Sequence, residues 1–169
     1  MRIIAIVAGK ALYSFRNEED RLLYETSLQH SNWKELPRGC IVGLALIDDA
    51  GPYDPSCHTD PFAFGPYVYH IKDVVPLETP IAYKGNLGLL KITDDIQTLI
   101  MSQVSVAEKI QTWLKEEKEV WGHEQLHGIS IRQPPAEAII KGMKTYENRS
   151  RSMFSIKNKI SSKKTQTHI

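Results

Sequence analysis

The chain has 169 residues, of which 41% are hydrophobic and 24% charged, and its net charge is +1. This length allows a normal single-domain core without disulfides or metals, and the near-zero net charge excludes a chain that is basic throughout. The charge is unevenly spread, however, because no Asp or Glu follows Glu147 while six Lys or Arg do. A phosphate backbone would therefore be attracted mainly to the C-terminal end.

The two cysteines, Cys40 and Cys57, form no CxxC pair and predict free thiols in a reducing compartment. The apolar N-terminus is too short for a signal peptide, and we interpret it as a strand. No apolar run approaches the roughly 20 residues that cross a bilayer. We expect a soluble, cytoplasmic protein with no membrane partner.

The first third of the chain predicts two strands and a helix. The Ile- and Val-rich run 2–8 indicates a buried strand. Residues 17–30 predict a helix, with Asn17 as its N-cap and acidic residues in its first turn. Residues 40–48 predict a second strand, in which Gly43 marks a bulge or a close approach.

The middle of the chain predicts further short strands separated by turns. The composition of 49–61 is typical of a loop. The aromatic-rich stretch 62–77 predicts a strand ending near Pro76, and 81–92 predicts two short strands around a turn at 84–86. Such a pattern indicates an antiparallel barrel or sandwich.

From about residue 93 the hydrophobic pattern of the sequence changes to helical periodicity. Apolar residues over 94–120 recur at helical spacing, which predicts one long helix or two helices broken near Ser102. A strand over 129–132 follows, then a helix from Pro134 or Pro135 to about Lys141 with Gly142 past its end. A strand over 144–149 completes this unit. The Ser- and Lys-rich tail, 154–169, is expected to be disordered.

Four segments resemble parts of the ASCH domain family. ISIRQPPAEAIIKGMKTYENRSR resembles the family's opening S-x-R-Q-P element, with its short helix and its K-T-x-E-x-R strand. RIIAIVAGK and LPRGCIVGLALIDD resemble the next two family strands. FAFGPYVYHIKDVVPLETPIAYKGNLGLLKI resembles the closing strands, with F-G-P-Y and K-G-x-L-G-L.

The resemblance implies an α+β fold, a PUA-like small β-barrel with flanking helices, in permuted or strand-swapped form. The order differs from the family, because the opening element comes after the barrel strands. The implied parts are the main barrel at 1–93, a helical connector at 94–127, the opening strand-helix-strand at 128–153 and the basic tail at 154–169. The opening element would close its own barrel, close a partner's barrel in a homodimer by segment exchange, or begin a truncated second domain. We favour closure, since a barrel lacking a strand exposes an edge.

Several polar side chains are candidates for a site. Lys10 ends the first strand, where it is a surface lysine or, as the resemblance implies, lies at the mouth of the family's cleft. Alternation places Glu147 and Arg149 on one face of their strand and Asn148 on the other, as a phosphate and base site or as a plain salt bridge. Lys10 and Glu147 are the candidate catalytic pair.

The strand before the short helix adds Ser130 and Arg132, which share a face by alternation. Gln133 is predicted to bind a base edge or simply to cap the following helix. Pro135 stands where the family commonly has an aromatic residue, which puts base stacking there in doubt.

Lys144 and Thr145 are also binding candidates. They are similar to residues of a family branch that hydrolyses acetylated cytidine, but Glu147 stands where that branch has its Thr, so we discount that activity. Tyr67, with Tyr69, Phe62 and Phe64, offers a stacking face for a base or belongs to the core. We expect neither a metal nor another cofactor.

These residues predict a module that binds nucleic acid, RNA above all, or a nucleotide. One alternative is a metal-independent ribonuclease or nucleoside-modifying hydrolase that uses the same cleft. The other is a non-catalytic dimerising protein with a vestigial cleft.

Overall fold

A computed structural model describes residues 1–29 and 32–152, which form an α+β fold around one curled sheet. The sheet has six strands in the order β4-β5-β1-β2-β3-β6. The strands are β1 (Arg2–Leu12), β2 (Cys40–Pro52), β3 (Tyr67–Ala82), β4 (Leu89–Lys91), β5 (His127–Gln133) and β6 (Tyr146–Arg149). The helices are α1 (Glu18–Leu28), α2 (Asp94–Met101), α3 (Val104–Glu116) and α4 (Pro135–Ile140), with a short 3-10 turn at Trp33–Glu35. The predicted tail, 154–169, lies outside the described residues.

The two strands that come last in the sequence lie in the sheet formed by the first strands of the same chain. β5 pairs in parallel with β1, so that Ile6 lies opposite Ile129. β6 pairs antiparallel with β3, so that Tyr69 lies opposite Glu147. The strand-helix-strand unit therefore supplies strands on both sides of the β1-β2-β3 meander. Its exchange between two chains stays a prediction.

The predicted strands differ from the observed ones mainly in the middle of the chain. Residues 49–52, predicted as loop, continue β2. β3 begins at Tyr67 rather than at residue 62, and it runs through Pro76 to Ala82. A strand tolerates proline where the ladder is already irregular, and Pro76 pairs with Gly43 directly beside a register shift.

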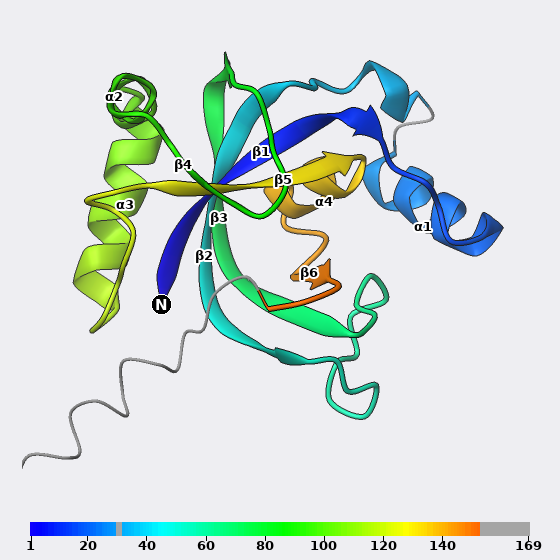
Figure 1. The fold of residues 1–169 in the computed structure, drawn as a ribbon. Coiled ribbons are helices and arrows are strands. Elements are labelled where there is room, and N and C mark those ends of the chain that lie inside the picture. Colours follow the sequence, from blue (N-terminus) through cyan, green and yellow to red (C-terminus); the bar gives the residue numbers. More distant parts are fainter. Residues whose placement is uncertain (30–31, 153–169) are drawn as a thin grey trace, which may run out of the picture.

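Helices cover both faces of the sheet, and Figure 1 shows α2 and α3 on one side and α4 with α1 on the other. The predicted helical stretch 94–120 contains two helices, α2 and α3, broken at Ser102, which is the second of the two predicted alternatives. Trp113 of α3 is buried in the core of that face. Its indole Nε1 donates to Asp73 of β3 at 2.9 Å, which fixes the helix against the strand.

The short helix α4 packs closely on β2 because Gly43 has no side chain. A Cβ built at Gly43 would lie 2.4 Å from Ile140 Cδ1 and 2.6 Å from the Val75 carbonyl oxygen. The predicted close approach at Gly43 is thus the contact between sheet and helix. After α4 the chain turns through Gly142 at φ +73°, a conformation that favours glycine.

None of the helices in the described part of the chain combines the length and apolar character needed to span a bilayer.

Candidate functional site

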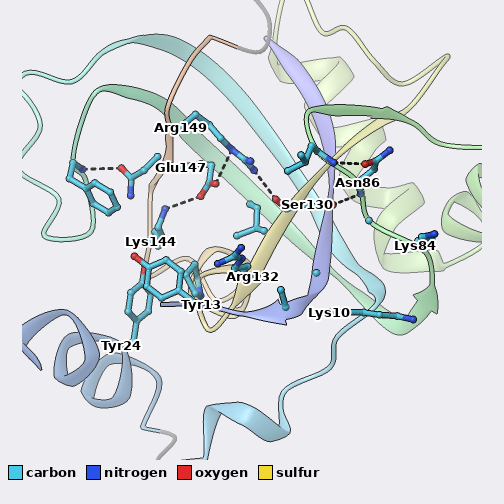
Figure 2. A pocket seen from close by; sticks show the side chains of 18 residues that line it. Lys10, Tyr13, Tyr24, Lys84, Asn86, Ser130, Arg132, Lys144, Glu147 and Arg149 are labelled. Atoms are coloured by element: carbon cyan, nitrogen blue, oxygen red, sulfur yellow. Dashed lines mark hydrogen bonds and ion pairs between the residues drawn. The ribbon is translucent and has the colours of Figure 1, made fainter. Parts of the chain in front are cut away.

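A pocket of about 680 Å³ lies where β6, at one end of the curled sheet, faces the part of β5 that extends beyond its pairing with β4. Arg149 of β6 spans this opening, since its Nη2 donates to the Ser130 carbonyl oxygen of β5 at 2.9 Å. The pocket is lined by Gly9, Lys10, Ala11, Tyr13, Tyr24, Phe64, Lys84, Gly85, Asn86, Leu87, Ser130, Ile131, Arg132, Pro135, Lys144, Glu147, Asn148 and Arg149 (Figure 2). The volume lies within the range of about 300–1,000 Å³ that small-ligand sites occupy.

A cluster of three charges, of which Lys144 and Glu147 are buried and Arg149 is partly buried, forms one wall of the pocket. The Lys144 ammonium donates to Glu147 Oε2 at 3.0 Å and to the Tyr146 carbonyl oxygen. Arg149 Nε lies 3.1 Å from the other Glu147 oxygen, Oε1, without the alignment of a hydrogen bond. Since Lys144 and Glu147 are almost fully buried, the pair is desolvated, and removing either partner would leave an uncompensated charge.

Aromatic rings form the adjoining part of the wall. Tyr24 of α1 packs edge-on against Tyr13, with ring centroids 5.8 Å apart. Phe64 lines the pocket from the loop before β3, and the Arg16 guanidinium covers its ring at 3.9 Å. Asn148 fixes that loop, because its Oδ1 accepts from Phe64 N at 2.9 Å. The pocket therefore combines flat apolar surfaces with buried charge.

Hydrogen bonds from the loop between β1 and α1 to Asp20 of α1 hold the aromatic wall. The Tyr13 hydroxyl donates to Asp20 at 3.2 Å, and Arg16 donates to the same carboxylate at 2.9 Å. Burial, together with the negative charge of Asp20, raises the pKa of Tyr13 to about 12. Burial also raises the pKa of Tyr24. Both phenols therefore stay neutral donors at physiological pH.

Three exposed cations, Lys10, Lys84 and Arg132, lie along the outer part of the pocket. Figure 2 shows Lys10 and Lys84 on the side of the pocket opposite Lys144. Arg132 lies between Lys144 and these two lysines. The loop that carries Lys84 is held by Ser130, whose Oγ accepts from Asn86 N at 3.0 Å.

Of the nine candidate site residues, six line this pocket: Lys10, Ser130, Arg132, Lys144, Glu147 and Arg149. Phe64, Pro135 and Asn148, which the sequence analysis also discussed, line it as well. On the last strand, Glu147 and Arg149 contact each other, as alternation predicts, while the Asn148 amide binds the loop before β3; all three residues line the pocket. The candidate catalytic pair is not brought together. Glu147 contacts Lys144 and Arg149, whereas Lys10 lies on the opposite side of the pocket.

The other three candidates lie elsewhere. Gln133 is fully buried, and its Oε1 accepts from Glu137 N while its Nε2 donates to the Pro37 carbonyl oxygen, each at 3.0 Å. It caps α4, the structural alternative for this residue. Thr145 precedes β6 and binds the Asp60 carboxylate through its N–H and hydroxyl. Tyr67 packs against the core and against Tyr69.

The sequence analysis missed Tyr13, Tyr24 and the loop from Lys84 to Leu87. Tyr24 sits in the helix predicted over 17–30, where an aromatic residue among polar ones indicates packing rather than a site. The turn at Lys84-Gly85-Asn86 was recognised, but only the tertiary structure places it beside Ser130. A Cβ at Gly85 would lie 2.3 Å from Ser130 Oγ, so the close approach requires glycine there.

Over residues 1–29 and 32–152, no group of three or more His, Cys, Asp or Glu side chains is arranged to hold a metal ion. Comparisons with protein-family models, curated proteins and solved structures gave no significant match.

Proposed function

We propose that the pocket binds a nucleotide or a segment of single-stranded nucleic acid, RNA above all. The observation that carries this proposal is the separation of two surfaces within one pocket. Tyr13 lies at one end, and the exposed cations Lys10 and Lys84 lie at the other. Phe64 also lines the pocket and is linked to Tyr13 through Arg16 and Asp20. Aromatic faces stack on bases, and Lys and Arg pair with phosphates.

The balance of charge supports an anionic ligand. Among the described residues that line the pocket, five are cationic and Glu147 is the one carboxylate. This local excess contrasts with the net charge of +1 for the whole chain. Association with a phosphorylated ligand is therefore favoured at the pocket rather than over the whole surface.

The family membership is part of the same proposal. The curled sheet with flanking helices is compatible with a permuted, PUA-like ASCH module, and the motifs that resemble the family supply Ser130, Arg132, Glu147 and Arg149 to the pocket. The hydrolase alternative has weaker geometric support, because Lys10 and Glu147 lie on opposite sides of the pocket.

The proposal is tested by fluorescence anisotropy with a labelled oligoribonucleotide across a series of salt concentrations. Affinity is expected to fall as salt rises, because bound phosphates release counterions. Arg132→Ala should weaken binding about 5- to 10-fold and reduce the slope of log K against log[salt] by roughly one.

A matched control is Lys118→Ala, which removes an exposed cation between α3 and β5 that does not line the pocket. It should bind RNA as the wild type does. Absence of binding at low salt, or equal losses in the two variants, would contradict a nucleotide site in this pocket.

A further inference from the structure

We infer that the buried end of the pocket is selective for guanine, an inference that rests on the proposed nucleotide-binding function. It derives from the order of polar groups on that wall, where the Glu147 carboxylate lies between the Lys144 ammonium and the Arg149 guanidinium. A ligand entering beside the aromatic rings meets an acceptor flanked by donors.

Glu147 retains acceptor capacity toward the pocket. An ionised carboxylate accepts about four hydrogen bonds through its two oxygens. Oε2 takes one from Lys144, and Oε1 is approached by Arg149 Nε without an aligned hydrogen bond. Both oxygens can therefore accept from a ligand, and a buried carboxylate gains most from donors that approach in parallel.

The flanking cations retain donors as well. An ammonium has three N–H donors and a guanidinium has five. Lys144 uses two for Tyr146 and Glu147, and the described hydrogen bond of Arg149 uses one, to the Ser130 carbonyl oxygen. The wall thus offers two neighbouring acceptors with a donor on either side.

Guanine matches this pattern better than the other bases. Its N1–H and exocyclic N2–H are adjacent donors that fit both oxygens of one carboxylate, and its O6 is the next group along, where a cation can donate. Adenine and cytosine place a ring-nitrogen acceptor beside their amino group, which would face the second carboxylate oxygen and repel it. Uracil offers a single N–H. Unpaired buried polar groups make such mismatches costly.

The rest of the pocket accommodates a guanosine phosphate. Figure 2 shows Tyr13 beside the charge cluster, and Phe64 is hydrogen-bonded to Asn148, the neighbour of Glu147, so a base that contacts Glu147 can also lie against one of these rings. The outer cations Lys10, Lys84 and Arg132 are then available to the phosphate. The volume of about 680 Å³ suits a ligand of this size.

The test is calorimetric titration of the full-length wild-type chain with GMP, IMP, AMP, CMP and UMP. IMP is the informative probe, because it differs from GMP only in lacking the exocyclic amino group. GMP should bind tightest, and IMP about tenfold more weakly, which corresponds to one lost hydrogen bond to a charged acceptor. Equal binding of GMP and IMP, or tighter binding of another base, would overturn the inference while leaving nucleotide binding intact.

A second arm separates a free nucleotide from RNA as the source of guanine. Uridine oligonucleotides with and without one central guanosine are compared by anisotropy. A preference for GMP among the mononucleotides identifies free nucleotide as the source. If no mononucleotide binds but the oligonucleotide with guanosine is preferred, RNA is the source; both outcomes support guanine selectivity. If neither mononucleotides nor oligonucleotides bind, the proposed function fails and the selectivity with it.

Glu147→Gln assigns the selectivity to the carboxylate. The amide keeps one acceptor but replaces the other with a donor, so the GMP to IMP affinity ratio should fall from about 10 to about 1. Glu137→Gln on α4 is the matched control, because this partly buried carboxylate does not line the pocket, and it should keep the wild-type ratio. The wild-type ratio of GMP to IMP remains a complete test if Glu147→Gln does not fold.

Discussion

At the scale of single residues, Arg132 and Gln133 are neighbours with different tasks. Arg132 is exposed at the pocket, whereas Gln133 is buried with both ends of its amide hydrogen-bonded. Gln133→Leu should therefore lower the free energy of unfolding by about 2–4 kcal/mol, because it leaves Glu137 N and the Pro37 carbonyl oxygen without this partner. Arg132→Ala should change it by less than about 0.5 kcal/mol. Urea denaturation of both variants measures the difference, and equal stabilities would contradict the capping role of Gln133.

Asp20 makes the stability of the aromatic wall dependent on pH. Burial by itself raises the pKa of Asp20, but hydrogen bonds from Arg16 outweigh burial and hold the pKa below its ordinary value of 3.8. A depressed carboxyl pKa contributes stability that is present above the unfolded-state pKa and is lost as pH falls through the folded-state pKa.

Asp20→Asn should therefore cost about 2 kcal/mol at pH 7, the contribution of hydrogen bonds to a charged group. The difference from the wild type should shrink below about pH 3.8, as the wild-type carboxyl becomes protonated. Urea denaturation at pH 7 and at successively lower pH measures it. A difference that stays constant down to the acid transition would show that the charge of Asp20 is not the source.

At the scale of secondary-structure elements, one side chain fixes α3 on the sheet. Trp113→Phe keeps an aromatic ring in the core but removes the Nε1–H bond to Asp73. The expected loss in the free energy of unfolding is about 1–3 kcal/mol, since the acceptor is a carboxylate. Lys115→Ala, at an exposed position of the same helix, should stay within about 0.5 kcal/mol of the wild type. Thermal or urea denaturation tests both, and equal effects would contradict the anchoring role of Trp113.

The elements with strong local patterns could be predicted from the sequence. The Ile- and Val-rich run before Gly9 became β1, and Asn17 caps α1 by accepting from Asp20 N. The path of β3 through Pro76 could not be predicted, because proline suggests a strand end unless the partner strand is known to be irregular there. The local sequence of β3 carries no information about the pairing of Pro76 with Gly43 of β2.

The candidate site, too, could be predicted from the sequence only in part. Alternation along β6 correctly placed Glu147 beside Arg149, and Ser130 and Arg132 of β5 line the same pocket. The aromatic wall was missed because Tyr13 and Tyr24 reach the pocket only through the packing of α1 on α4. Gln133 was ambiguous, since the same amide suits a base edge and a helix N-terminus, and only its burial decided between them.

At the scale of the whole molecule, the order of segments has a consequence for assembly. β5 and β6 pair with β1 and β3 of their own chain, and Arg149 links the two ends of the curled sheet. We therefore predict a monomer, with a mass near 19.2 kDa by light scattering at micromolar concentration. A stable dimer under these conditions would favour exchange of this segment between chains.

The central claim is that a nucleotide binds between the edges of β5 and β6. It is tested most directly by following backbone amide chemical shifts of the ¹⁵N-labelled protein during titration with GMP. The account predicts saturable shifts concentrated at residues 84–87, 130–132 and 147–149, with little change along α2 and α3, which do not line the pocket. Shifts concentrated on α2 and α3, or no shifts with either millimolar GMP or a guanosine-containing oligoribonucleotide, would contradict it.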